Sequence, residues 1–541
     1  MNFICPWQVS IGLRIWMAEE KPVSIYLLPL LAPVLLSLGA ALGFLRPGRR
    51  PHLSLTLIEA AAVGAMLAAL TSLVILVLKG PGDAGLAGLG SIGDLVRLDA
   101  VSASMLLLVT FIGWVVVRYS RTYLDGESRQ GAFMGWLCLT LVFVLLLVIV
   151  GNLFQLLSAW IATSLSLHRL LLFYPGRMAA QRAARKKFVT ARLGDVALLG
   201  AAVLLAAAYH TTHIAQILKA AQAGEGGNLA VGAASLLALA ALLKSAQFPT
   251  HGWLTEVMET PTPVSALLHA GVINAGGFLL IRFADVMLLA PGVLAVLVMI
   301  GGFTALFGSL VMLTQPAVKT SLAWSTVAQM GFMILQCGLA LFPLALLHIV
   351  AHSLYKAHSF LASGGAVERV TAIRRPGPVA IPNAGAVGRA FLAALVIYFF
   401  VGLGFGLTHK SPQAIALGAI LIFGVAYMLA QGFADAAPRA LTQRTAVYAV
   451  ATSVGYFALQ SAAASVTAGI LPPTPTPGPL EWALIVLAVI SFGLVAIVQA
   501  MFPLWAYHPA AAALRVHLSN GFYANAAFDR LVGGWSTRSA P

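Results

Sequence analysis

The stretch LALAALLKSAQFPTHGW, residues 237–253, carries a lysine inside an apolar run and a proline just beyond it. Backbone groups in lipid must be hydrogen-bonded within their own segment, so the run is expected to be a helix. Pro249 lacks a backbone donor, and we therefore predict that the helix breaks just past Lys244. A charge at the bilayer centre costs about 2.5–3.5 kcal/mol even on the mildest scale, which makes a functional role the default hypothesis.

Two interpretations of Lys244 are open. Broken helices at membrane depth line the cavities of ion transporters, and a lysine held out of water there can load and release a proton. The alternative is a lysine that extends to the membrane surface, because the apolar run ends soon after it.

The whole chain has the composition of a membrane protein. Of its 541 residues, 60% are hydrophobic and 9% are charged, and the mean hydropathy is +0.92. A soluble domain carries about 25% charged residues, so these values exclude a soluble enzyme, a disordered chain and a nucleic-acid binder. We expect a multi-pass protein surrounded by membrane lipid.

The fold class predicted is an all-α polytopic membrane protein with about 15 transmembrane helices, each needing about 20 mainly apolar residues. Residues 1–24 lack the pattern of a cleaved signal peptide and are expected to be an N-terminal extension. The apolar runs lie near residues 25–45, 57–78, 99–119, 132–150, 152–173, 193–209, 230–248, 264–283, 291–313, 321–341, 343–364, 390–408, 413–432, 445–470 and 480–502.

Lys and Arg are distributed unequally between the two sides of this arrangement. Loops after odd-numbered runs hold 19 of them, against 7 on the other side. The basic side is cytoplasmic, so we predict a bacterial inner-membrane protein with its N-terminus outside and its C-terminus inside. Residues 174–192 form the most basic stretch and are read as a topology signal, or alternatively as a docking surface for an anionic lipid or a partner.

A second group of ionisable residues lies in LLHIVAHSLYKAHSF, residues 346–360. His348, His352 and Lys356 are four residues apart and therefore share one helix face. Two imidazoles and an ammonium on one face suit a proton relay, since histidine titrates closest to neutral pH. The alternatives are a zinc site, for which no nearby carboxylate or cysteine completes the ligand set, and packed histidines with satisfied hydrogen bonds.

A third group lies in TEVMETPTPVSALLHAG, residues 255–271. Glu256 and Glu259 precede a helix whose first turn holds two prolines, and His269 follows within the apolar run. Acids are favoured near a helix N-terminus by its dipole, and they could equally feed protons towards Lys244.

We find no pattern for a cofactor in this chain. Cys138 and Cys337 sit inside apolar runs and Cys5 is distant, so neither a disulfide framework nor a metal site is predicted. No Walker loop, dinucleotide fingerprint or nucleophile elbow is present. The sequence therefore indicates a transport subunit and not an enzyme.

Five stretches resemble the antiporter-like membrane subunits, a superfamily that includes the L, M and N subunits of respiratory complex I and the Mrp sodium/proton antiporters. Together they cover much of residues 95–370, in the order found in the L subunit. They are LDAVSASMLLLVTFIGWVVVRYSRTYLDGE (98–127), FVTARLGDVALL (188–199), KSAQFPTHGWLTEVMETPTPVSALLHAGVINAGGFLLIR (244–282), VKTSLAWSTVAQMGFMIL (318–335) and HIVAHSLYKAHSFLASGGAV (348–367).

The resemblance implies two inverted five-helix repeats, each with one broken helix. It implies N-terminal transmembrane helices over 25–130, a first repeat over 131–290, a second over 291–435, C-terminal helices over 436–502 and a cytoplasmic tail over 503–541. By the same resemblance Lys244 takes the place of the pumping lysine, and His348, His352 and Lys356 match the central relay. Lys319 matches the lysine that opens the preceding helix, and Asp195 with Arg192 matches a family pair.

The chain departs from the superfamily pattern at two sites. Ile161 stands where the family has the glutamate that partners the pumping lysine. The expected second broken helix, AFLAALVIYFFVGLGFGLTHK (390–410), has Gly402, Gly404 and Gly406 but no mid-membrane charge. A long lateral helix of the complex I type is not expected after residue 502.

In these departures the chain resembles the DabB branch of the superfamily. It resembles that branch also in the HRLL stretch at 168–171 and in the tail HLSNGFYANAAFDR (517–530). That resemblance implies a hetero-oligomer with a DabA-like peripheral subunit, which would hold the zinc and hydrate CO2 to bicarbonate. The chain itself would conduct the cation, a proton or sodium ion, that energises inorganic carbon uptake. The alternative is a complex I subunit L-like or Mrp-type Na+/H+ antiporter subunit.

Overall fold

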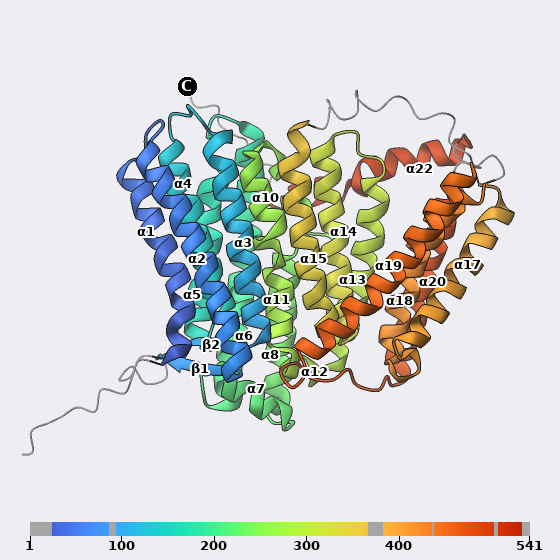
Figure 1. Cartoon of the computed structure of the whole chain (residues 1–541), viewed down its shortest axis with the longest axis horizontal. Helices are drawn as coiled ribbons and strands as arrows, with labels where there is room; N and C mark the ends of the chain where they lie inside the picture. The colour runs from blue at the N-terminus through green and yellow to red at the C-terminus, as the bar shows by residue number, and fades with distance from the viewer. Residues whose placement is uncertain (1–23, 86–92, 366–381, 435–437, 503–506, 533–541) are drawn as a thin grey trace, which may run out of the picture.

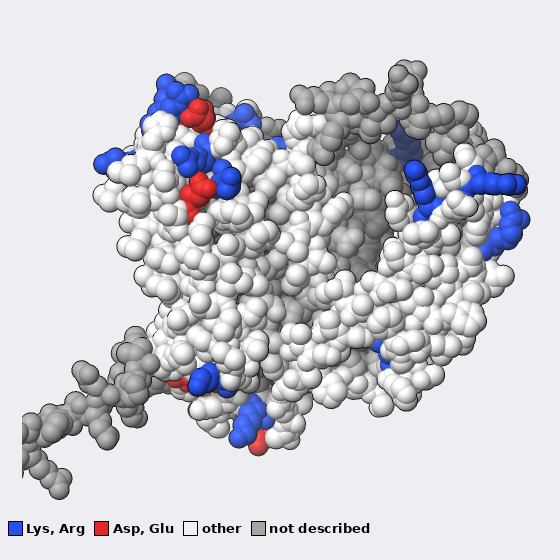
Figure 2. Space-filling view, in the orientation of Figure 1, with Lys and Arg blue, Asp and Glu red and all other residues white. Residues whose placement is uncertain are grey.

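The computed structural model describes residues 24–85, 93–365, 382–434, 438–502 and 507–532. Within these ranges the chain is almost entirely helical, and most helices stand side by side (Figure 1). Twelve of the described helices are long and apolar enough to cross a membrane, which makes the chain a multi-pass integral membrane protein. Figure 2 shows Lys and Arg gathered towards two opposite ends of the visible face, with a mostly uncharged belt between them.

The first part of the bundle contains four long helices. The chain enters through η1 (Ile25–Leu30) and continues as α1 (Leu31–Leu45), α2 (His52–Lys79), α3 (Ala100–Tyr123) and α4 (Gln130–Val148). The predicted N-terminal extension, residues 1–24, lies outside the described residues except for Ser24, whose side chain accepts a hydrogen bond from the backbone N–H of Tyr26.

The predicted all-α polytopic fold is confirmed, with a short β-hairpin within it. Strands β1 (Gly82–Gly85) and β2 (Asp94–Leu98) pair antiparallel, with Ala84 opposite Val96. They lie at one end of the bundle between α2 and α3 (Figure 1). Strands of four and five residues cannot be detected by looking for apolar runs of 20 residues.

The next four helices correct the predicted extent of the basic loop. They are α5 (Leu153–Leu171), α6 (Met178–Tyr209), the short α7 (Ile214–Gln222) and α8 (Gly227–Lys244). Helix α6 has 32 residues and includes most of the stretch 174–192, because its Ala, Arg, Lys and Gln are good helix formers.

The chain breaks where the sequence predicts. Helix α8 ends at Lys244, and α9 (Gly252–Thr255), η3 (Val257–Glu259) and α10 (Thr262–Ala270) follow. The expected single helix near 264–283 is interrupted: α10 stops at Gly271, η4 (Val272–Asn274) intervenes, and α11 (Ala275–Arg282) resumes. Helix α12 (Ala284–Leu288) then leads to the next long helix.

Three long helices form the centre of the molecule: α13 (Pro291–Met312), α14 (Val318–Gly338) and α15 (Phe342–Leu361), followed by η5 (Ala362–Gly365). Helices α14 and α15, like α5, coincide with predicted runs but are not among the twelve most apolar helices. All three direct several polar side chains towards the protein interior, which lowers their hydropathy without exposing those groups to lipid.

The C-terminal helices stand to one side of this bundle (Figure 1). They are α17 (Ala384–Gly404), η6 (Leu407–His409), α18 (Pro412–Gly432), α19 (Arg439–Val466), which crosses its neighbours obliquely, and α20 (Pro479–Ala500). The break predicted at the glycines is present, because α17 ends at Gly404 and Gly406 adopts a left-handed φ of 70°.

The tail is helical and returns along the bundle. Helix α22 (Pro509–Ser519) lies across the end of the bundle (Figure 1), and η7 (Gly521–Tyr523) and α23 (Ala524–Val532) follow. The described part of the tail thus contains short helices of 11 and 9 residues. The tail contacts helices that are distant in sequence, through Phe522, Asn525 and Asp529.

Candidate functional site

Lys244 lies at the point where α8 ends, and it is buried. Its ammonium nitrogen sits 4.4 Å from the centre of the Trp160 ring on α5, a distance suited to a cation–π contact. The helices pack closely here: a β-carbon on Gly276 of α11 would lie 2.6 Å from the carbonyl oxygen of Ala241. The lysine predicted from the sequence is thus enclosed by protein and does not extend to the membrane surface.

Asp195 is a carboxylate whose charge acts on Lys244. It lies on α6, is buried, and pairs with Arg192 one turn earlier at 2.7 Å. The position that holds a glutamate in the family is taken by Ile161, which packs against the main core. The carboxylate whose charge acts on Lys244 is therefore on α6, whereas the α5 position is apolar.

Lys186 and Lys187 are functional candidates that the sequence reasoning missed. Both were counted as topology charges in a loop, yet both are buried on α6. The ammonium group of Lys187 donates to the carbonyl oxygen of Ser164 at 2.6 Å and to its hydroxyl at 2.8 Å. The helical spacing of Ala183, Lys187 and Thr190 on one buried face could have indicated this.

The ammonium group of Lys186 joins two acids. It lies 2.5 Å from the carboxylate of Glu256 and also pairs with Asp529 of α23. Glu256 therefore faces Lys186, and its role in feeding protons towards Lys244 stays a prediction. The side chain of Glu259 lies outside the described atoms.

The tail holds this corner of the site. The side-chain amide of Asn525 donates to the hydroxyl of Thr255 at 3.4 Å, and a β-carbon on Gly252 would overlap that same amide. The ring of Phe522 contacts Phe307 on α13. Segments 270 residues apart thus meet beside the break that follows Lys244.

A small cavity of about 20 Å³ joins Lys244 to the interior of the bundle. Lys187 and Thr190 of α6 line it together with Leu268 of α10. A volume of this size accommodates about one water molecule, and polar partners are present on its wall. The cavity therefore offers room for water beside the two lysines.

His269 and Lys356 form the next part of the site. His269 is fully buried and stacks on Phe360 of α15, with the ring centres 4.4 Å apart. Lys356 is also fully buried, and its ammonium group donates to the hydroxyl of Ser325 at 2.7 Å and to the carbonyl of Leu322 at 3.4 Å. The charge of Lys356 acts on His269, so the two groups are electrostatic neighbours.

His348 and His352 lie on α15, the helix that also carries Lys356. Their ring centres are 5.9 Å apart, and His352 interacts electrostatically with Lys356 and His269. Both nitrogens of His352 and of His269 have no hydrogen-bond partner among the described protein groups. Because an unpartnered buried polar group is costly, these imidazoles favour a hydrated path. The one-face arrangement predicted from the four-residue spacing is confirmed.

The interrupted span between α10 and α11 contacts the same helix. Asn274, at the interruption, donates through its side-chain amide to the hydroxyl of Ser353 at 2.8 Å and to the carbonyl of Ala270 at 3.0 Å. Lys319 lies in the first turn of α14, where it is partly buried, one turn before the Leu322 carbonyl that Lys356 contacts. The structure thus brings His269, Lys356, His352 and His348 together, whereas Lys244 lies with Lys187 and Asp195.

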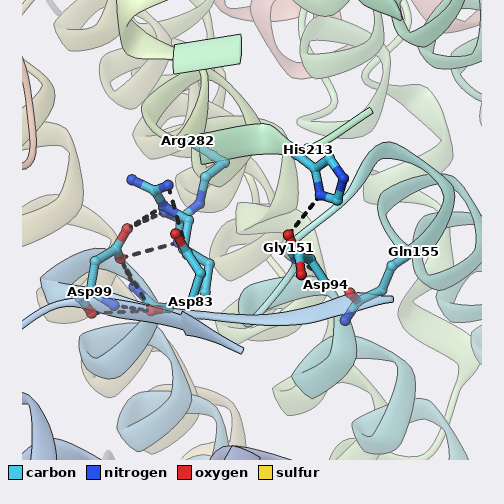
Figure 3. A network of polar contacts seen from close by, with 9 residues as sticks. Asp83, Asp94, Asp99, Gly151, Gln155, His213 and Arg282 are labelled. Carbon is cyan, nitrogen blue, oxygen red and sulfur yellow. Dashed lines mark hydrogen bonds and ion pairs between the residues drawn. The ribbon is translucent and has the colours of Figure 1, made fainter. Parts of the chain in front are cut away.

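A polar network braces the opposite end of the bundle, where the hairpin lies (Figure 3). The carboxylate of Asp99 accepts from Arg282 at 2.5 Å and from Arg97 at 2.9 Å, and its helix-capping bond comes from the backbone of Ser102. Burial alone would raise the pKa of Asp99, but the two guanidinium groups bring it well below its usual range. Figure 3 also shows His213 of the α6–α7 connection facing the hairpin. Its Nδ1 atom lies 2.7 Å from the carboxylate of Asp94 on β2.

The long helices, the break after Lys244 and the buried lysine–histidine line define an antiporter-like membrane subunit. The family model described as NADH:quinone oxidoreductase/Mrp antiporter, TM, matches residues 150–375. The model of the N-terminus of complex I chain 5 matches residues 94–134. The chain belongs to the complex I subunit L and Mrp antiporter-like membrane family.

Within this family the chain is similar to subunits named for inorganic carbon transport. It is 49% identical over 275 residues to the "Probable inorganic carbon transporter subunit DabB" of Hydrogenovibrio crunogenus, covering 50% of this chain and 53% of that protein. The match to the "Probable inorganic carbon transporter subunit DabB2" of Halothiobacillus neapolitanus is 38% over 446 residues, covering 81% and 80%. The first alignment thus spans about half of its relative and the second about four fifths.

The fold is also similar to that of one chain in a solved antiporter complex. A chain in the structure of the Mrp complex from Dietzia sp. DQ12-45-1b superposes with a TM-score of 0.59 at 25% identity. The superposition covers 95% of this chain and 60% of that one.

Proposed function

We propose that this chain is the membrane cation-conducting subunit, moving protons, of an energy-coupled complex that takes up inorganic carbon. The observation that carries the proposal is the presence of two sets of buried ionisable groups: Lys244 with Lys187 and Asp195, and His269 with Lys356 and His352. Burying such groups in a membrane protein is costly, and they mark ion pathways when they occur together. The names of the relatives supply the carbon-uptake part of the proposal.

In this proposal Lys244 is the loading group and Asp195 is the acid that balances its charge. A proton released by Lys244 passes through the small cavity towards His269 and reaches Lys356, and His352 and His348 carry it along α15. Each imidazole can accept on one nitrogen and donate from the other, which suits a relay. Lys187 would tune Lys244 by like-charge repulsion, since the two ammonium groups are electrostatic neighbours.

The membrane arrangement belongs to the same proposal. All 15 predicted runs cross the membrane, in two inverted five-helix repeats with breaks after Lys244 and at Gly404–Gly406. Only the first break carries a charged side chain. The excess of Lys and Arg orients the N-terminus outside and the C-terminal tail inside. A cysteine at exposed Arg182 should therefore resist a membrane-impermeant thiol reagent in intact cells, and labelling from outside would reverse the orientation.

The partner we propose is a DabA-like peripheral subunit that holds the zinc and performs the hydration of CO2. This chain would hold no metal and supply the ion flow alone. Histidines of the relay would then need to stay free for protons.

The test uses the chain co-expressed with a DabA-like zinc protein, in a host that requires high CO2. Lys244→Ala should abolish growth at ambient CO2 while the protein accumulates in the membrane at the wild-type level. The matched control is Lys79→Ala, a lysine at the end of α2 remote from this region. Normal growth with Lys244→Ala would contradict the proposal, and so would loss of growth with the control.

The second candidate is a Na+/H+ antiporter or complex I-type subunit, favoured by the match to the Mrp complex. It predicts rescue of a sodium-sensitive host and no effect of the zinc partner. Rescue of the CO2-requiring host, dependent on that partner and abolished by a protonophore, would favour the first candidate.

A further inference from the structure

Two adjoining cavities form one groove on the outside of the bundle, between α4, α5 and α6. The first has a volume of about 560 Å³ and is lined mainly by apolar side chains, among them Trp136, Phe143 and Leu165. The second has about 290 Å³ and includes Gln181 and Arg185 of α6. His168 and Leu172 line both cavities, so the two share part of their wall.

The groove has two chemically different ends. Its apolar end lies along the middle of α4 and α5, where Leu165 is 45% exposed and faces the surroundings of the bundle. Its basic end lies at the last turn of α5, which contains His168 and Arg169, and at the first turns of α6. No Asp or Glu is among the described residues that line either cavity.

Two side chains at the basic end, Arg169 and His168, pack against aromatic rings. The guanidinium carbon of Arg169 lies 5.7 Å from the centre of the Trp136 ring, and the His168 ring tilts against Phe188 with centres 5.3 Å apart. The Nδ1 atom of His168 is buried with no hydrogen-bond partner among the described groups. Arg169 and Arg185 at this end supply hydrogen-bond donors and positive charge.

From this pairing of an apolar channel with a basic head region we infer that the groove binds an anionic phospholipid. Its acyl chain lies along Phe143 and Leu165, and its phosphate lies between Arg169 and Arg185. Basic pockets between transmembrane helices bind such headgroups, and the groove volume is in the range of ligand sites. A free phosphate would leave the larger, apolar cavity unused.

The bound lipid would act on the site described above. Leu165 follows Ser164, and Phe188 follows Lys187, so the groove wall lies next to the bond between Lys187 and Ser164. A lipid wedged between α5 and α6 would stabilise this contact. The inference therefore assigns a positioning role to a membrane lipid, independent of which substrate the complex transports.

The experiment is native mass spectrometry of the purified full-length protein in detergent, titrated with cardiolipin, phosphatidylglycerol and phosphatidylethanolamine of the same acyl chains. The wild type should retain the two anionic lipids at least tenfold better than phosphatidylethanolamine. The double variant Arg169→Gln, Arg185→Gln should lose that preference. The control variant Arg439→Gln, Arg444→Gln removes two exposed arginines of α19 and should keep it.

A second variant tests the apolar end. Ala162→Phe fills the groove without changing its charge and should reduce retention of all three lipids by severalfold. Size-exclusion chromatography and circular dichroism check that each variant is folded. The inference would be overturned if the wild type retained all three lipids equally, or if the control variant lost the preference as fully as the double variant. It would also be overturned if inorganic phosphate competed with the lipid, or if Ala162→Phe displaced a co-purified protein helix.

Discussion

Replacing Asp99 by asparagine tests whether the network at the hairpin end clamps the broken span to the N-terminal helices. The side chains of Asp99 and Arg282 are each 2% exposed, and they join the start of α3 to the end of α11, 183 residues away. Asparagine caps a helix about as well as aspartate, so the cap of α3 survives the change. The substitution therefore keeps the cap and removes the charge that pairs with both Arg282 and Arg97.

The expected loss is about 3–5 kcal/mol of unfolding free energy, the usual cost of leaving one partner of a buried ion pair uncompensated. Arg282→Met should cost less, about 1.5–3 kcal/mol, because Asp99 keeps its hydrogen bonds from Arg97 and Ser102. The double variant should cost less than the sum of the two single changes, since the coupling energy is counted once.

The assay is equilibrium unfolding in mixed detergent micelles with increasing SDS, followed by tryptophan fluorescence. Since the pKa of Asp99 is lower in the folded protein, its contribution is full above the unfolded pKa of about 3.9 and is lost as the pH falls below that value. The gap between wild type and Asp99→Asn should therefore shrink under acid conditions. A loss below about 1 kcal/mol at neutral pH, or a greater loss for Arg282→Met, would refute the reasoning.

Three further outcomes are expected. Lys356→Met and Lys356→Arg should both prevent growth at ambient CO2 at equal expression, because arginine keeps the charge but cannot release a proton; an active arginine variant would make Lys356 a fixed charge only. Lys186→Met should lower the thermal midpoint more than Asp529→Asn does. The Asp529→Asn change should cost about 0.2–1 kcal/mol, because Asp529 is 47% exposed and Glu256 still pairs with Lys186. The reverse order in a thermal-shift assay would contradict the joint pairing of Lys186 with Glu256 and Asp529. Asp125→Asn, which breaks only the exposed pair with Arg50, should leave the thermal midpoint and growth unchanged, and a fall of several degrees would show that this pair is structural.

Local sequence pattern was sufficient for the helices and for part of the site. The end of α8 at Lys244 follows from an apolar run and a nearby proline, and the shared face of His348, His352 and Lys356 follows from their spacing. Both are properties of a single helix. The membrane orientation, the repeats and the roles of these residues stay predictions.

Only the tertiary structure decided which charged groups are buried and what they contact. Lys186 and Lys187 stand in the most basic stretch of the chain and look like surface charges until α6 packs against α5 and α9. Their partners, Ser164, Glu256 and Asp529, come from three separate segments. Hydropathy and the 3.6-residue period describe neighbours along one helix, whereas the energy of a buried charge depends on groups brought to it from anywhere in the chain, and that choice is made by packing.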